Sequence, residues 1–144
     1  MSESTVEKST MLLNVTLPIL AGGAIYLMLS SDVIFIQTVY DITGIQTSGI
    51  VETSFFLRII RFYLPDMLWG YSLLFSLIAV SGCKDLKAVF ILSVVFMIIM
   101  ECTQMHPSVP GTFDPWDIVA EIAALTLAVF IINKLKREEK INEN

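Results

Sequence analysis

Four long apolar blocks, separated by short polar segments, decide what this chain can fold into. The first block is the clearest, because no charged residue lies between Lys8 and Asp32. A helix that rises 1.5 Å per residue needs about 20 mostly apolar residues to cross roughly 30 Å of hydrocarbon. The sequence therefore predicts an all-α membrane protein in which one domain, residues 1–144, contains four transmembrane helices. Their expected bounds are about 12–30, 64–80, 88–105 and 115–133.

The composition agrees with a membrane location and argues against one class of partner. Hydrophobic residues make up 55% of the chain and charged residues 16%, whereas an ordinary soluble domain has roughly 25% charged residues. So few charges leave too little polar surface to cover a soluble core. The formal net charge is -5, and no basic stripe is interleaved with aromatic residues, which argues against nucleic acid. The expected partners are membrane lipids, and the sequence leaves the oligomeric state open.

The distribution of Lys and Arg predicts the orientation of the helices. Cytoplasmic segments of membrane proteins retain these residues, whereas translocated segments do not. Seven of the nine basic residues lie before the first helix, between the second and the third, or after the fourth: Lys8, Lys84, Lys87, Lys134, Lys136, Arg137 and Lys140. We therefore expect a multi-pass protein of the cell membrane with both termini in the cytoplasm.

The long connection between the first and second spanning helices, residues 31–63, is then expected outside the cell. Within residues 50–63, Arg58 and Arg61 recur at helical spacing, while aromatic and aliphatic residues fill the other side. This pattern predicts an amphipathic helix that lies in the outer membrane interface. The two arginines then either extend into water or face an anionic lipid headgroup. The sequence leaves the structure of residues 31–49 open.

Acidic residues inside the predicted spanning helices are the main indication of function. Asp66, Glu101 and Glu121 each lie about 20 Å along the helix axis from the cytoplasmic end. An ionised carboxylate that faces lipid at this depth is disfavoured, so these side chains should face inward or toward a water-filled cleft. Gln104 shares a helix face with Glu101, and Asp114 and Asp117 share one with Glu121, because they lie at helical spacing from these acids. We expect an outward-facing acidic pocket whose ligand-binding residues, together with Arg58 and Arg61, are Asp66, Glu101, Gln104, Asp114, Asp117 and Glu121.

A purely structural role is the alternative for three of these acids. Asp114 is placed to cap the fourth spanning helix, Asp117 lies in its first turn, and Asp66 lies in the expected first turn of the second. Carboxylates at such positions stabilise a helix N-terminus. Capping does not explain Glu101 or Glu121, because both lie beyond the reach of a first turn.

The same residues allow several chemistries. Carboxylate oxygens suit Mg²⁺ or Ca²⁺, so either ion is chemically allowed at the cluster, although the sequence requires no cofactor. A single histidine, His106, and no suitable cysteine pair argue against zinc. No nucleophile elbow is present, so a hydrolase is disfavoured. A proton-coupled small-molecule exporter and a metal-assisted enzyme acting on an envelope lipid remain alternatives to a binding protein.

Three short motifs follow one another in about the last 85 residues: Leu64-Pro65-Asp66, then Glu101 with Gln104, then Asp114 with Asp117. In this order they resemble the VanZ-like family of small bacterial membrane proteins. Glu101, Gln104, Asp114 and Asp117 match the family pattern residue by residue. The resemblance implies a link to glycopeptide (teicoplanin) tolerance in some members, without an established reaction.

The chain also departs from that family pattern. Thr112 stands where the family usually has Arg, Glu121 where it has Asn, and Ala123-Ala124 where it has Leu-Gly. The outer loop has therefore lost a positive charge, and the helix after it has gained a negative one. We expect the pocket to recognise an envelope lipid or an amphiphilic antibiotic such as a glycopeptide, rather than to turn over a substrate.

Overall fold

Five helices make up most of the chain. The computed structural model describes residues 8–29, 34–44, 54–82, 85–109 and 111–142. The helices are α1 (Lys8–Leu29), α2 (Ile34–Thr43), α3 (Phe55–Ser81), α4 (Leu86–Thr103) and α5 (Pro115–Asn142), and these ranges contain no strand. All except the short α2 are long and apolar enough to cross a membrane. The predicted all-α class and four spanning helices are thus confirmed.

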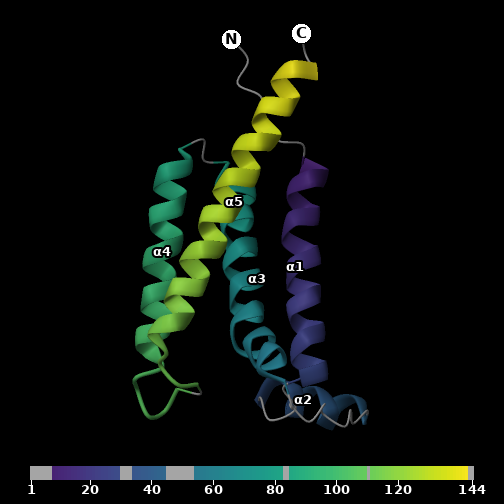
Figure 1. Cartoon of the computed structure of the whole chain (residues 1–144), viewed down its shortest axis with the longest axis vertical. Helices are drawn as coiled ribbons and strands as arrows, with labels where there is room; N and C mark the ends of the chain where they lie inside the picture. The colour runs from purple at the N-terminus through teal and green to yellow at the C-terminus, as the bar shows by residue number, and fades with distance from the viewer. Residues whose placement is uncertain (1–7, 30–33, 45–53, 83–84, 110, 143–144) are drawn as a thin grey trace.

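α3 is the central helix of the bundle, because it packs against α1, α4 and α5. Figure 1 shows α5 crossing in front of α3, with α4 and α1 on opposite sides. The start of α1, the start of α4 and the end of α5 lie at one end of the bundle. α2 lies across the other end of the bundle (Figure 1). α1 therefore begins, and α5 ends, at the same end of the bundle.

Large apolar side chains and small residues together form the core. Leu74 and Phe75 of α3 are fully buried against Leu125 of α5 and Met97 of α4. α3 approaches α5 closely at Gly70, where an added Cβ would lie 3.6 Å from the Cα and Cβ of Glu121. Small residues allow such close approach in membrane bundles. The close approach at Gly70 brings an acidic residue of α5 against the backbone of α3.

α3 begins earlier than the sequence predicts. The expected second spanning helix starts near Leu64, and a separate interfacial helix was expected within residues 50–63. The structure instead joins Phe55–Tyr63 to the spanning helix without a break, with Pro65 inside it; residues 50–53 lie outside the described ranges. Neighbouring helices in a membrane bundle can satisfy the backbone groups that a proline leaves unbonded, and Figure 1 shows α3 turning toward α2 near this end. The expected interfacial helix is therefore not confirmed, and the first-turn position expected for Asp66 is wrong.

The end of α5 also differs clearly from the expected one, whereas the remaining helix ends lie within a few residues of their expected positions. Gly82 ends α3 in the left-handed conformation, with φ 59°, and donates its N–H to the carbonyl of Ile78 at 3.0 Å. Asp85 caps α4 by accepting from the N–H groups of Lys87 and Ala88. α5 continues past the expected end at Asn133 because the residues that follow are mostly good helix formers. Figure 1 shows this last part of α5 extending beyond the other helices.

Candidate functional site

Four carboxylates from three helices gather in the part of the bundle away from the helix ends that hold the basic residues. We call them the acidic cluster: Asp66 of α3, Glu101 of α4, and Asp117 and Glu121 of α5. The charges of Asp66, Glu101 and Asp117 all act on Glu121, and those of Asp66 and Glu101 act on Asp117. The cluster therefore brings four acidic side chains together inside an apolar bundle.

Glu101 is the best-bonded member of the cluster. Its side chain is only 6% exposed. Its Oε1 accepts from Nε2 of Gln104 at 2.9 Å, and its Oε2 accepts from the backbone N–H of Asp114 at 3.4 Å. Gly111 adopts φ 122°, and a Cβ there would collide with the side chain of Gln104. Glu101 and Gln104 therefore hold the loop between α4 and α5 in place.

Asp114 begins α5, as the structural alternative expects. Its Oδ1 accepts from the N–H of Trp116 at 2.9 Å, and its carbonyl accepts from the N–H of Asp117 at 3.0 Å. These bonds satisfy backbone groups at the start of a helix that have no partner within it. Asp117, in the first turn, is partly buried and lies on the cluster side of α5.

Asp66 connects the cluster to α1. Its Oδ1 accepts from the hydroxyl of Tyr26 at 3.4 Å, and both side chains are partly buried. The sequence analysis missed Tyr26. A tyrosine near the end of a spanning helix is typical of a membrane-interface anchor, so the residue alone gave no signal that distinguished a cluster contact from an anchor.

Glu121 differs from the other members because one of its oxygens is fully buried and still accepts no hydrogen bond. The side chain is 8% exposed, and its buried Oε2 accepts no hydrogen bond from any described part of the chain. A buried polar atom left in this way destabilises the fold by about 1–3 kcal/mol, and by more if it is charged. An unsatisfied buried carboxyl oxygen in a folded protein is unusual and therefore calls for an explanation.

The expected arginine pair lies to one side of the cluster. Arg58 and Arg61 precede Asp66 by eight and five residues in α3, or about 12 and 8 Å along the helix axis. Arg58 is exposed, whereas Arg61 is partly buried with its guanidinium 5.3 Å from the centre of the Phe62 ring. The structure therefore brings the predicted acids together and leaves the two arginines nearer the start of α3.

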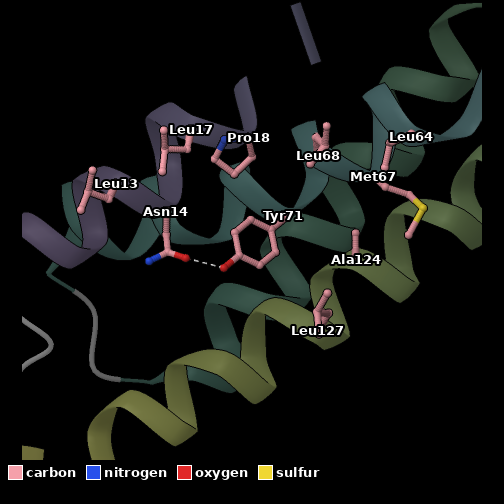
Figure 2. Close-up of a pocket in the computed structure, with 10 residues that line it drawn as sticks. All are labelled: Leu13, Asn14, Leu17, Pro18, Leu64, Met67, Leu68, Tyr71, Ala124 and Leu127. Carbon is pink, nitrogen blue, oxygen red and sulfur yellow. Dashed lines mark hydrogen bonds between the residues drawn. The ribbon is translucent and has the colours of Figure 1, made fainter. Parts of the chain in front are cut away.

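A groove of about 400 Å³ lies between α1, α3 and α5. Figure 2 shows the one hydrogen bond drawn across it, in which the hydroxyl of Tyr71 donates to Oδ1 of Asn14 at 2.5 Å. The remaining lining residues are apolar: Leu13, Leu17, Pro18, Leu64, Met67, Leu68, Ala124 and Leu127. Leu64 and Met67 of the lining flank Asp66 in the sequence of α3, but none of the four carboxylates of the cluster lines the groove.

Oxygen acceptors dominate the chemistry of the acidic cluster. In the ranges that the structure describes, no group of three or more His, Cys, Asp or Glu side chains is arranged to hold a metal ion. Cys102, next to Glu101 in the sequence, is exposed and not in a disulfide.

Comparisons with protein-family models, with curated proteins and with solved structures found no match for this chain.

Proposed function

We propose that this membrane protein binds the polar head of an amphiphile in its acidic cluster, and that the amphiphile is an envelope lipid or an amphiphilic antibiotic such as a glycopeptide. The observation that carries the proposal is the gathering of Asp66, Glu101, Asp117 and Glu121 from three helices. Carboxylates inside a membrane are costly and usually belong to a functional site. Binding is favoured over turnover because the cluster includes no activated nucleophile.

The position of the basic residues supports an outward-facing site in the cell membrane. Lys8 begins α1, Lys87 lies in the first turn of α4, and Lys134 lies in the last part of α5. These three ends lie together at one end of the bundle (Figure 1). Because basic residues favour the cytoplasmic side, we place that end and both termini in the cytoplasm. The acidic cluster then lies in the outer half of the membrane.

The groove supports an amphiphile as the ligand. Its volume of about 400 Å³ falls within the roughly 300–1,000 Å³ range of ligand pockets. Its lining is apolar apart from Asn14 and Tyr71, and it includes Leu64 and Met67, which flank Asp66 in the sequence of α3. A ligand with a polar head and an apolar chain can use both features of the bundle.

We also propose that the chain is related to the VanZ-like family. The four residues that match the family pattern are linked in one hydrogen-bonded unit: Gln104 and Asp114 both donate to Glu101, and Asp117 donates to Asp114. A shared role in closing the outer loop supports treating them as one motif.

Native mass spectrometry of the purified protein tests the proposed function. The parent chain, extracted from bacterial membranes in a mild detergent, should retain a co-purified lipid or other amphiphile. The double variant Asp66→Asn/Asp117→Asn should lose it, because the variant removes two charges from the cluster. Asp41→Asn, the same change at an exposed position in α2, is the matched control and should retain the ligand. Equal retention in the double variant would refute the proposal.

A proton-coupled exporter is the second candidate, and the unpartnered oxygen of Glu121 favours it. A carboxyl group without a fixed partner can lose and regain a proton during a transport cycle. Efflux of a dye from proteoliposomes under an imposed pH gradient, present with the parent and absent with Glu121→Asn, would support the exporter. For a binding protein, we expect no gradient-driven efflux from either.

A further inference from the structure

The four carboxylates of the acidic cluster differ in what they can still accept. Both oxygens of Glu101 accept hydrogen bonds from the chain, and Asp66 accepts one from Tyr26. Glu121 is more than nine-tenths buried, and its Oε2 accepts no hydrogen bond from the described residues. Glu121 therefore carries the buried open acceptor of the cluster, whereas both oxygens of Glu101 already accept hydrogen bonds.

The charges around that oxygen select the sign of the group it can receive. Three further carboxylates, those of Asp66, Glu101 and Asp117, act on Glu121. An anionic phosphate or carboxylate head would be repelled by all of them, whereas a cation would be attracted by all. A neutral hydroxyl would satisfy the oxygen but leave the mutual repulsion of the acids unrelieved. The electrostatics therefore favour a positively charged hydrogen-bond donor.

The geometry further narrows the kind of cation. Ca²⁺ requires six to eight oxygen ligands around one point, and the described side chains form no metal-holding group. A guanidinium group is best recognised by both oxygens of one carboxylate in a planar pair, whereas the cluster presents carboxylates from three different helices. An ammonium group is a compact charge with three donors that can point to different acceptors. It can reach Oε2 and still interact with the neighbouring acids.

We infer that Oε2 of Glu121 accepts a hydrogen bond from the primary ammonium group of a membrane amphiphile that binds in the acidic cluster. The inference rests on the proposed function, because it names the head group that the same site accepts. Glu101 keeps its role of holding the outer loop and does not contact the ammonium nitrogen.

Three amphiphiles with the same chain test the inference: dodecylamine, dodecyltrimethylammonium and dodecanol. Each is titrated into the full chain in phosphatidylcholine nanodiscs, and empty nanodiscs give the background from partitioning into lipid. Dodecylamine should bind the parent at least about tenfold more tightly than the other two, since only it combines a positive charge with N–H donors. This ranking needs no variant and is therefore independent of whether a variant folds.

Two variants then locate the binding. Glu121→Gln keeps the side-chain volume and should weaken dodecylamine binding by at least about tenfold. Glu138→Gln, the same change at an exposed site on α5, should leave the affinity unchanged. If dodecanol binds the parent as tightly as dodecylamine and Glu121→Gln weakens both, the proposed function stands but the ammonium assignment is overturned. Unchanged dodecylamine affinity in Glu121→Gln, or no dodecylamine binding to the parent, also overturns the inference.

Discussion

The hydroxyl of Tyr26 in α1 donates a hydrogen bond to Oδ1 of Asp66 in α3, across 3.4 Å and between two residues that lie forty positions apart in the chain. This bond joins a spanning helix without internal charges to the acidic cluster. α1 also makes a polar contact with α3 closer to its start, where Asn14 accepts from the hydroxyl of Tyr71.

Tyr26→Phe should therefore lower the stability of the bundle. The substitution keeps the ring and removes only the donor, so we expect the free energy of unfolding to fall by about 1 kcal/mol. The midpoint of thermal unfolding in detergent, followed by tryptophan fluorescence, measures the change. Tyr63→Phe, the same substitution on α3, is the control. Identical midpoints for Tyr26→Phe and the parent would show that the bond contributes nothing to stability.

Glu101→Gln and Glu121→Gln should change stability in different directions. In Glu101→Gln, one of the two donors that contact the carboxylate meets an NH₂ group, which should cost about 1–3 kcal/mol. In Glu121→Gln, no described donor loses its acceptor, and the repulsion from three neighbouring carboxylates disappears. We expect that variant to unfold at the same temperature as the parent or at a higher one. A larger loss of stability in Glu121→Gln than in Glu101→Gln would contradict the assignment of their roles.

Two glycine substitutions should separate a loop constraint from a packing contact. Gly111→Ala places a side chain at φ 122° and drives it into Gln104, whose amide is already bonded to Glu101. We expect it to destabilise the protein by more than about 1 kcal/mol. In Gly70→Ala, the new methyl meets the flexible end of Met97, which can move away, so the loss should be smaller. Chemical denaturation of both variants in one detergent gives the comparison.

Cysteine labelling in intact cells should place the two ends of the bundle in different compartments. In a background with both native cysteines replaced by serine, Ser108→Cys should react with a membrane-impermeant maleimide added outside. Glu138→Cys, in the last part of α5, should react only after the cells are opened. The expectation follows from the basic residues at that end. The reverse pattern would place the acidic cluster in the inner half of the membrane.

The sequence predicted the four spanning helices well because long charge-free stretches in a membrane have few other structures available. It misplaced the start of α3, because a proline followed by an acid usually marks a first helical turn. Pro65 and Asp66 lie inside α3 instead. Because of this error, capping alone could account for Asp66, which the structure places in the acidic cluster.

The contacts of α1 were beyond sequence reasoning for a different reason. Its residues are apolar on every side, so no periodic pattern shows which face packs against α3. Tyr26 and the groove that contains Asn14 depend on that choice of face. The convergence of Asp66, Glu101 and Glu121, by contrast, could be anticipated from their similar depth along three helices. The sequence could not show which of these acids has a buried oxygen that accepts no hydrogen bond, because that depends on the partners seen in the structure.

The bond from the N–H of Asp114 to Glu101 also restricts which insertions and deletions the chain can tolerate. It fixes the point at which α5 begins, and each later residue of the helix turns by about 100°. Removing one residue between Asp114 and Glu121 would rotate the latter out of the core, although the helix itself would persist. Length changes in the loop between α4 and α5, before Gly111, leave that count intact. Relatives with the same site should therefore vary in the length of the loop but keep the spacing of seven residues from Asp114 to position 121.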